Sequence, residues 1–215
     1  MKKIIEVSAL AFSKKKTEFK KMAKIIKNKN INHLHYDVMD NIFVKNTAFN
    51  GEYLKFLKEK IGYIISVHLM VNDVEKYVSL FLNYKIDYLT FHCEPIAISK
   101  AIEILKLIKL CNIKAGIAIK PQTNIMDYQE LFHHIDIITV MGVEPGFGGQ
   151  KFILSTVEKL KEIKKVIPPN IIIQLDGGVN LEVIKLTKEY VDFFVSGSFL
   201  INYENDFNEI FTLIK

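Results

Sequence analysis

Residues 63–92 read YIISVHLMVNDVEKYVSLFLNYKIDYLTFH, a stretch in which two short apolar runs flank a longer segment of helical period. The runs, residues 63–69 and 88–92, are rich in Ile, Val, Leu, Phe and Tyr. Near-continuous apolar runs of about four to eight residues are typical of strands buried on both faces of a parallel sheet. Because parallel strands need a crossover, the segment between the runs is expected to be a helix. The stretch therefore predicts one strand–helix–strand unit.

The same alternation continues in both directions and gives eight strand–helix pairs. The predicted strands are residues 4–10, 31–37, 63–69, 88–92, 115–119, 135–141, 171–176 and 193–196. Eight pairs in 215 residues average about 27 residues each, close to the lower size limit of a closed barrel with short loops. We therefore predict an α/β fold, a (β/α)8 TIM barrel that occupies residues 1–215 as one domain. A doubly wound open sheet is the alternative.

Three predicted helices have sequence signals at their first residues. Ser155 and Glu158 have the spacing of a capping box, and Asn72 and Glu75 have the same spacing. Asn180 precedes the predicted seventh helix and is a residue type that caps helices. These positions agree with the predicted order of strands and helices.

The charge balance gives a net charge of +5, from 29 Lys+Arg and 24 Asp+Glu, and all of the basic side chains are lysines. The densest basic run, residues 14–27, has the charge of a nucleic-acid-binding segment. However, Phe19, Met22, Ala23 and Ile26 recur at i, i+3, i+4 and i+7, so the lysines are predicted to form the solvent-facing side of an amphipathic helix. We therefore expect no nucleic-acid partner.

The compartment is predicted from the cysteines and from the first residues. Met1-Lys2-Lys3 before an apolar run resembles a signal peptide, but Glu6 lies in the middle of that run and favours a buried first strand. Two cysteines are too few for a disulfide framework, and no apolar run approaches the length of about 18 residues that a membrane span needs. We expect a cytoplasmic protein without membrane association.

Polar side chains gather near the carboxyl ends of the predicted strands, where (β/α)8 barrels place their active sites. His35 and Asp37 point to the same face because side chains alternate along a strand. With His68 and Asp176 from two other strands they make a set of two imidazoles and two carboxylates, which suits Zn, Fe(II), Mn or Co. We predict that these four residues form one site. His92, in the fourth predicted strand, fits a place in this site and a hydrogen-bonded core position equally well.

Glycine-rich segments follow the last three predicted strands. These are residues 145–150 (PGFGGQ), 176–178 (DGG) and 196–198 (SGS). Glycines leave backbone N–H groups unobstructed, so such loops can surround an anion, and (β/α)8 barrels commonly bind phosphate in this region. Because the chain has no arginine, amides, hydroxyls or lysine would hold the phosphate. One such loop could be a plain tight turn, but three together predict a phosphate site.

Seven short strings connect these features to a known family. They are HLHYDVMDNIFVKN, VHLMV, FHCE, GIAIKPQT, VMGVEPGFGGQKF, DGGVN and VSGS. Their order and spacing resemble those of the ribulose-phosphate 3-epimerase family, and the resemblance extends from Ser8 to about Ser198. It includes the specific motifs His-x-Asp-x-Met-Asp and Pro-Gly-Phe-Gly-Gly-Gln.

The resemblance implies an isomerase of carbohydrate metabolism that interconverts D-ribulose 5-phosphate and D-xylulose 5-phosphate in the pentose phosphate pathway. It implies one divalent metal ion as cofactor, with ligands at His35, Asp37, His68 and Asp176. Asp37 and Asp176 also match the two catalytic carboxylates. The positions that match sugar-phosphate contacts are Ser8, His68, Gly146, Phe147, Gly148, Gly149, Asp176, Gly177, Gly178, Gly197 and Ser198. Met39, Met70 and Met141 match methionines that line the family's site, although core packing explains each of them equally well.

The implied chemistry accounts for the two carboxylates. Inverting C3 beside a ketone requires a proton to leave one face and another to arrive at the opposite face. A positioned carboxylate on each face can do this, each worth about 10²–10⁴ in rate. A metal ion at the C2 and C3 oxygens would stabilise the enediolate by on the order of several kcal/mol.

Asn41, Lys45, Lys120 and Glu144 depart from the residues usual in the family, but none of them removes a predicted ligand or base. These departures leave open the nearest alternative, a 3-epimerase that acts on a hexulose phosphate such as allulose 6-phosphate. The alternative from another class is a barrel that binds sugar phosphate without turnover, which has no need of paired carboxylates. For either epimerase we expect a small sugar phosphate as the partner and a homo-oligomer as the assembly.

Overall fold

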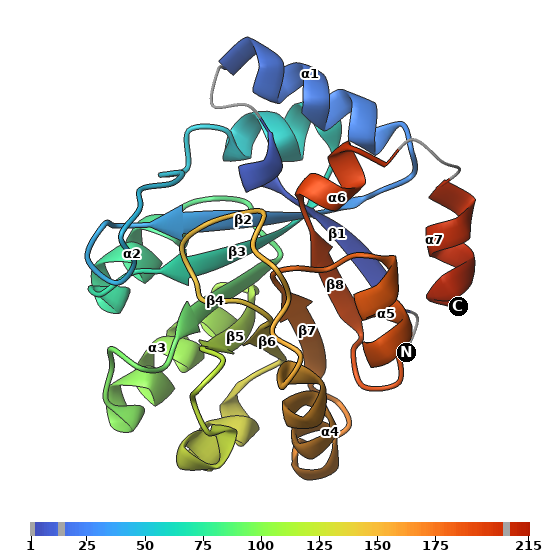
Figure 1. Ribbon diagram of the computed structural model, residues 1–215. Helices are drawn as coiled ribbons and strands as arrows, with labels where there is room; N and C mark the ends of the chain where they lie inside the picture. Colours follow the sequence, from blue (N-terminus) through green and yellow to red (C-terminus); the bar gives the residue numbers. More distant parts are fainter. Residues whose placement is uncertain (1–2, 13–15, 204–206) are drawn as a thin grey trace.

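In the computed structural model, which describes residues 3–12, 16–203 and 207–215, eight parallel strands follow one another around a closed barrel (Figure 1). The strands are β1 (Ile4–Ser8), β2 (His33–Met39), β3 (Ile64–Met70), β4 (Tyr88–His92), β5 (Lys114–Ile119), β6 (Ile137–Met141), β7 (Ile172–Asp176) and β8 (Phe193–Ser196). Each strand pairs with the next in sequence, and β8 pairs with β1, so the sheet has no free edge. The predicted (β/α)8 barrel is confirmed, and the open sheet is wrong.

The predicted strand bounds are correct for β4 and β8 and differ elsewhere by a few residues. The first strand ends at Ser8 because residues 9–11 form a short 3-10 turn, η1 (Ala9–Ala11). The second strand starts at His33, two residues later than predicted. It continues to Met39 because its pairing with β3 extends to that residue. The sixth strand starts at Ile137 instead of residue 135.

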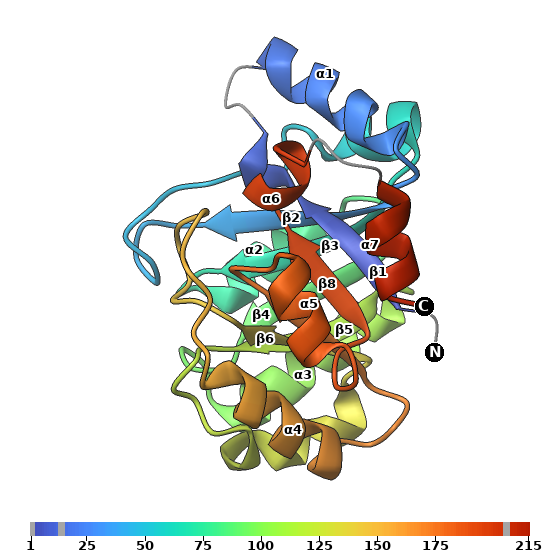
Figure 2. The same cartoon turned by 45° about the vertical axis from the view of Figure 1, so that its right-hand side comes forward.

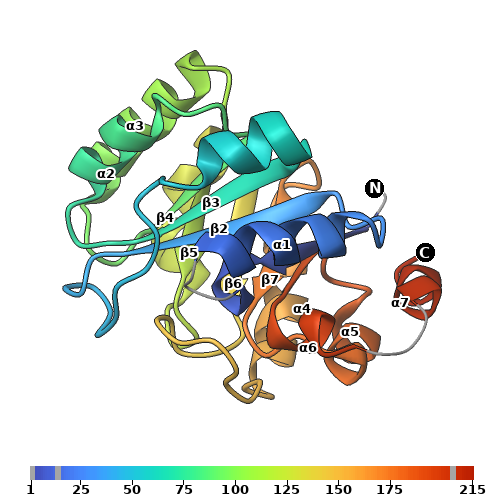
Figure 3. The same ribbon diagram turned by 90° about the horizontal axis from the view of Figure 1, so that it is seen from above.

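Helices form the outer layer around the barrel (Figure 1). They are α1 (Lys16–Lys27), α2 (Val74–Phe81), α3 (Ile98–Leu110), α4 (Thr156–Val166), α5 (Leu181–Thr187), α6 (Ser198–Ile201) and α7 (Phe207–Leu213). Figure 3 shows α2 and α3 side by side on one flank of the barrel. In place of an α-helix, the β2–β3 connection has a π-helical turn, η2 (Phe56–Ile61), and the β5–β6 connection has a 3-10 segment, η3 (Ile125–His134). None of the helices in the described ranges is long and apolar enough to cross a membrane.

The helix caps agree only partly with the sequence signals. Asn180 caps α5, and its side chain accepts a hydrogen bond from Val183 N. The cap of α2 is Asp73, one residue after the predicted Asn72. Ser155 makes no side-chain cap because its own backbone is already helical, at φ −61° and ψ −17°. A capping side chain needs an extended backbone to reach the first free N–H groups, so the predicted capping box at Ser155 is wrong.

Helix α1 has the amphipathic character predicted for the lysine-rich segment. Phe19, Ala23 and Ile26 are buried against the barrel, while Lys21 and Lys24 are exposed. Lys14 and Lys15, which belong to the same basic run, lie outside the described residues. Lys21 and Lys24 therefore lie on the solvent-facing side of the helix, as expected from the spacing of the apolar residues.

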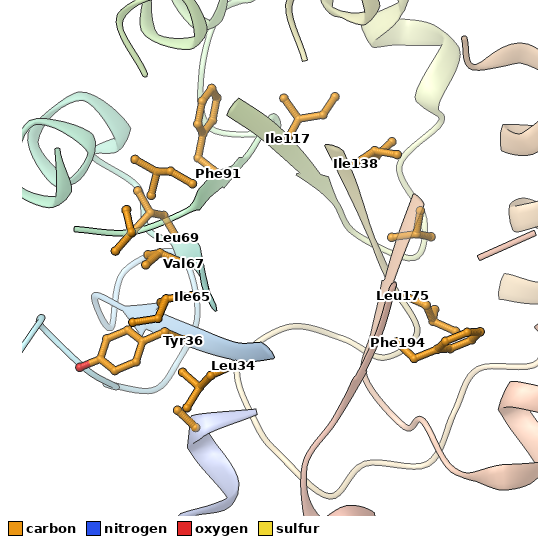
Figure 4. Close-up of a cluster of buried hydrophobic side chains, with 14 of the residues drawn as sticks. Leu34, Tyr36, Ile65, Val67, Leu69, Phe91, Ile117, Ile138, Leu175 and Phe194 are labelled. Atoms are coloured by element: carbon orange, nitrogen blue, oxygen red, sulfur yellow. The ribbon is translucent and has the colours of Figure 1, made fainter. Parts of the chain in front are cut away.

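The two faces of the strands carry different chemistry. Apolar side chains such as Leu34 and Phe91 belong to the buried core that packs beneath the outer helices, and Figure 4 shows them around the strands. The alternating residues face the barrel interior and are largely polar, with Glu6, Thr139 and Gln174 fully buried. The apolar strand residues thus form the core between the barrel and the helices. The polar strand residues lie inside the barrel.

Candidate active site

A cavity of about 720 Å³ lies at the carboxyl ends of the strands. Its volume is within the range of about 300–1,000 Å³ that is typical of small-molecule sites. The predicted site residues in its lining are Ser8, Asp37, Met39, Met70, Met141, Gly146, Phe147, Gly148, Gly149, Asp176, Gly177, Gly178, Gly197 and Ser198. His35 and His68 are fully buried beneath the lining, where each contacts both Asp37 and Asp176. The structure therefore brings all of the predicted site residues together.

Four of these side chains converge at the floor of the cavity. His35 Nε2 lies 3.2 Å from Asp37 Oδ1 and 3.5 Å from Asp176 Oδ2. His68 Nδ1 lies 3.3 Å from Asp37 Oδ1 and 3.5 Å from Asp176 Oδ2, and the two imidazole nitrogens are 3.3 Å apart. The strand register causes part of this convergence, because Asp37 on β2 is paired with His68 on β3.

The cluster fits a divalent metal ion. Ligand atoms placed tetrahedrally at about 2.0–2.2 Å from an ion are about 3.3–3.6 Å from one another. The measured separations between the imidazole nitrogens and the carboxylate oxygens are 3.2–3.5 Å. Asp37 Oδ1 is buried and has no hydrogen bond of good geometry, although both imidazoles are within ion-pair distance. An oxygen in this position needs a cation, so His35, Asp37, His68 and Asp176 could hold a metal ion.

The orientation of His35 is fixed from behind the cluster. His35 Nδ1 lies 3.1 Å from Ser66 Oγ, and the Ser66 hydroxyl donates to Glu6 Oε2 over 3.1 Å. The hydroxyl has one hydrogen, so its oxygen accepts from His35 Nδ1–H. Gln174 Nε2 also donates to the same oxygen of Glu6. The His35 Nε2 lone pair is therefore directed into the cluster.

His68 has a different neighbour on its far side. His68 Nε2 lies 3.1 Å from His92 Nε2, and His92 Nδ1 lies 3.0 Å from Glu94 Oε2. Burial lowers the pKa of His92 to about 4, so this ring is neutral near pH 7. His92 is thus a buried, hydrogen-bonded residue that contacts a member of the cluster without belonging to the cluster.

The charges in the cluster shift the pKa values in opposite directions. Burial by itself lowers the pKa of His35, but the charges of Asp37 and Asp176 raise it well above the ordinary value of 6.5. Burial likewise raises the pKa of Asp37, but the charge of His35 and the contacts with both imidazoles hold it below the ordinary value of 3.8. The pKa of Asp176 is lowered by the same neighbours against its burial. The site therefore favours positive charge, as protons or as a metal ion.

Sequence comparisons identify the family. A model of the ribulose-phosphate 3 epimerase family matches residues 4–201. The chain belongs to the ribulose-phosphate 3-epimerase family. The ribulose-phosphate 3-epimerase of Mycoplasma genitalium is 41% identical over 172 residues, which cover 80% of each chain. That of Bacillus subtilis is 34% identical over 160 residues, which cover 73% of each chain. This membership makes the chain an enzyme that acts on carbohydrate phosphates.

Solved structures of other enzymes share the barrel of this epimerase-family chain. Orotidine 5′-phosphate decarboxylase from Pyrococcus horikoshii OT3 superposes with a TM-score of 0.70 at 15% identity, over 98% of this chain and 99% of that chain. A mutant tryptophan synthase alpha-subunit from Pyrococcus furiosus gives a TM-score of 0.67 at 12% identity, over 100% and 98% of the chains. At these identities the likeness concerns the fold alone.

The glycine-rich segments of the epimerase-family chain differ in what they require of glycine. Gly178 has a φ of +70°, and an added Cβ would lie 2.7 Å from the backbone of Phe152, so only glycine fits there. An added Cβ at Gly148 would have no heavy atom within 4 Å. Asn46 Nδ2 donates to Gly146 O over 2.6 Å, which connects the loops after β2 and β6. Figure 2 shows these loops extending from the same end of the barrel.

Three of the departures from the family pattern have a structural context. Asn41 has a φ of +61°, in the left-handed backbone region that asparagine tolerates better than most other residues with a side chain. Lys120 Nζ lies 4.0 Å from the centre of the Phe43 ring, a cation–π contact. Glu144 is exposed at the cavity rim, and its carbonyl oxygen accepts a hydrogen bond of 2.6 Å from Gln150 Nε2. Nothing in the structure explains Lys45.

The three methionines have both of the properties considered from the sequence. Met39, Met70 and Met141 are almost fully buried, and all three line the cavity. Met39 and Met70 pack with Val44 in a small apolar cluster that is separate from the main core. They therefore form an apolar wall next to the charged floor of the site.

Sequence reasoning gave no site role to Glu6, Ser66 or Glu94. Ser66 contacts His35 and is itself bonded to Glu6. Glu94 contacts His92, the neighbour of His68. A signal was present, because Glu6 is two residues before Ser8, Ser66 two before His68, and Glu94 two after His92. Glu6 and Ser66 lie within β1 and β3, where this spacing places both polar side chains on the barrel-interior face, whereas Glu94 lies in the turn after β4.

Proposed function

We propose that this chain catalyses the interconversion of D-ribulose 5-phosphate and D-xylulose 5-phosphate by inverting C3, in the pentose phosphate pathway. The observation that carries the proposal is the pair Asp37 and Asp176, which come from β2 and β7 and meet at the floor of a glycine-lined cavity. The membership in the epimerase family and the names of the relatives support the same substrate.

Asp37 and Asp176 are the proposed acid and base. One carboxylate takes the C3 proton, the C3–H electrons form a C2–C3 double bond, and the C2 carbonyl electrons move to the C2 oxygen. The opposite carboxyl group, which enters the step protonated, then gives its proton to the other face of C3 as the C2 carbonyl re-forms. After one turnover the first carboxyl group is protonated and the second is ionised. The reverse reaction therefore uses the same two groups with their roles exchanged. Ser8 Oγ donates to Asp37 Oδ2 over 3.1 Å, which leaves Asp37 Oδ1 for the cluster.

The same four cluster residues are the proposed ligands of one divalent metal ion, Zn, Fe(II), Mn or Co. Such an ion supplies a Lewis acid that stabilises negative charge on the C2 and C3 oxygens. His35 and His68 are fully buried and hold the nitrogen ligands in fixed positions. The four residues together offer two imidazoles and two carboxylates, a mixed donor set that these ions accept.

The phosphate end of the substrate is proposed to lie against the glycine-rich segments. Gly146, Gly148 and Gly149 follow β6, Gly177 and Gly178 follow β7, and Gly197 with Ser198 follows β8. All of them line the cavity, so their backbone N–H groups and the Ser198 hydroxyl are the proposed contacts of the anion. Met39, Met70 and Met141 exclude water from the reacting end.

Further properties stay predictions from the sequence. These are the organisation of residues 1–215 as one domain, a cytoplasmic location, a homo-oligomeric assembly and the absence of a nucleic-acid partner. The two cysteines, Cys93 and Cys111, are free thiols, which supports a reducing compartment.

The deciding experiment is an assay of purified, metal-quantified protein with D-ribulose 5-phosphate in deuterated water. We expect xylulose 5-phosphate with solvent deuterium at C3, loss of turnover on chelation, and recovery when a divalent ion is added. Turnover that survives complete metal removal would contradict the metal role and leave the epimerase. A higher kcat/KM with allulose 6-phosphate would contradict the pentulose substrate, and no turnover with either sugar would leave only a binding protein.

A further inference from the structure

A chain of hydrogen bonds extends from His68 away from the cavity. His68 Nε2 contacts His92 Nε2 at 3.1 Å, and His92 Nδ1 contacts Glu94 Oε2 at 3.0 Å. The other oxygen of the carboxylate, Glu94 Oε1, accepts hydrogen bonds from Lys120 N at 2.7 Å and from Thr123 Oγ1 at 2.6 Å. His68 and His92 are fully buried, so water does not compete for these contacts.

The direction of each hydrogen bond follows from the end of the chain. An ionised carboxylate can only accept, so Glu94 takes the proton of His92 Nδ1–H. A neutral imidazole with its proton on Nδ1 has a lone pair on Nε2, and this atom accepts from His68 Nε2–H. His68 then has its lone pair on Nδ1, the atom that lies 3.3 Å from Asp37 Oδ1 in the cluster.

We propose that His92 and Glu94 are positioning residues that set the tautomer of His68, and thereby give the metal site its second nitrogen ligand. The proposal rests on the metal site proposed above. Partners behind a metal-binding histidine fix its tautomer and orientation, and their loss typically costs about 10- to 100-fold in metal affinity. His35 has an equivalent support in Ser66 and Glu6, so each histidine of the cluster is supported by a separate carboxylate.

The surroundings of Glu94 make one substitution especially informative. The backbone N–H of Lys120 can only donate, so in a Glu94→Gln variant the side-chain carbonyl oxygen must stay beside Lys120 and Thr123. Lys159 Nζ holds that segment in place, with hydrogen bonds of 2.7 Å to both Lys120 O and Thr123 O. The new amide NH2 group would therefore face His92 Nδ1 and donate to it. His92 would then carry its proton on Nε2, and His68 would lose its acceptor.

The test measures zinc affinity and histidine tautomers. Zn2+ affinity, from competition with a chromophoric chelator, is expected to fall about 10- to 100-fold in Glu94→Gln. The matched control is Thr123→Val, which removes a hydrogen bond from the other carboxylate oxygen and keeps the charge and the contact with His92. It is expected to change the affinity by less than about threefold, because the Glu94–His92–His68 chain stays intact.

Two-bond 1H–15N spectra of Zn2+-loaded protein labelled at histidine give a readout that a merely structural role would not move. We expect His92 to be protonated at Nδ1 and His68 at Nε2 in the wild type, with His92 reversed in Glu94→Gln. A wild-type His92 protonated at Nε2 would overturn the proposal even if the variant did not fold. Unchanged zinc affinity in a folded Glu94→Gln would overturn it as well.

The failure of this proposal can be separated from a failure of the proposed function. Neither readout uses a sugar phosphate, so a negative result leaves the epimerase reaction in place. A wild-type protein that binds no Zn2+ would instead overturn the metal site, and this proposal with it.

Discussion

His35 Nε2 lies 3.3 Å from His68 Nδ1 at the floor of the cavity. One ring presents its ε nitrogen and the other its δ nitrogen, and the two histidines are offset in register by two residues, because His68 is paired with Asp37 and His35 with Ser66. Two imidazole lone pairs repel at this distance unless a cation accompanies them. The carboxylates of Asp37 and Asp176 complete a site whose charge favours such a cation.

Metal binding is therefore expected to stabilise the folded protein. An ion present at 100 times its Kd adds about 2.7 kcal/mol. For a chain of this size, about 2–4 °C per kcal/mol corresponds to a rise in Tm of about 5–10 °C. Differential scanning calorimetry of chelated and Zn2+-loaded protein measures this rise. Asp176→Asn is the matched variant, and an equal rise in that variant would show that the ion binds elsewhere.

Removing either carboxylate charge is expected to abolish most of the turnover. Asp37→Asn and Asp176→Asn keep the shape of the side chain but cannot take a proton, so kcat should fall by about 10²–10⁴. Circular dichroism and thermal unfolding check that the barrel persists. Near-normal kcat in a folded variant would remove that aspartate from the mechanism, and the other assignment would stand by itself.

The proposed phosphate contact of the glycine-rich segment after β6 can be tested without disturbing the fold. Gly148→Val adds a side chain where an added Cβ meets no heavy atom within 4 Å, so the fold should persist while the branched side chain obstructs the anion. We expect KM for the sugar phosphate to rise at least about tenfold, equal to about 1.4 kcal/mol of lost binding. Steady-state kinetics measure it, and an unchanged KM would place the phosphate elsewhere.

Gly178→Ala is the contrasting substitution in the same cavity. Its Cβ would lie 2.7 Å from the backbone of Phe152, at a φ of +70°. We expect a loss of folding free energy of at least about 1–2 kcal/mol from the left-handed backbone by itself, measured by urea unfolding. Unchanged stability would show that the loop after β7 relaxes freely.

Acid stability is expected to depend on Glu94. Burial raises the pKa of its carboxyl, but the hydrogen bond and charge of His92 outweigh this and hold it at about 2, against an ordinary value of 4.5. A pKa that is lower in the folded state gives stability that is present above about pH 4.5 and is lost as the pH falls toward 2. The stability advantage of the wild type over Glu94→Gln should therefore shrink between about pH 5 and pH 3.

Urea unfolding of both proteins at each pH, in the presence of a chelator, measures that difference. The chelator removes the contribution of metal ligation, so the two curves differ in the ionisation of Glu94 and of the His92 ring that it contacts. A difference in unfolding free energy that stays constant across this pH range would mean that Glu94 titrates normally in the folded protein.

Much of the fold could be predicted because its signals are local. The apolar runs that became β4 and β8 have the predicted bounds, since the period of an apolar run depends on neighbouring residues only. The cap of α2 at Asp73 could not be predicted as well, because Asn72 and Asp73 are both capping residue types. The backbone N–H of Asn72 donates to Asp40 Oδ2, so the position of Asn72 depends on a residue that is far away in the sequence.

The sequence by itself determined the barrel and the four side chains of its central cluster. Parallel strands bring their carboxyl ends to one rim, so His35, Asp37, His68 and Asp176 had to approach one another once the strand order was known. Only the tertiary structure decided which nitrogen of each histidine faces the cluster and which partners stand behind it. Those partners, Glu6 and Glu94 among them, belong to other strands or strand ends, and a hydrogen bond between strands depends on register and side-chain direction rather than on sequence spacing.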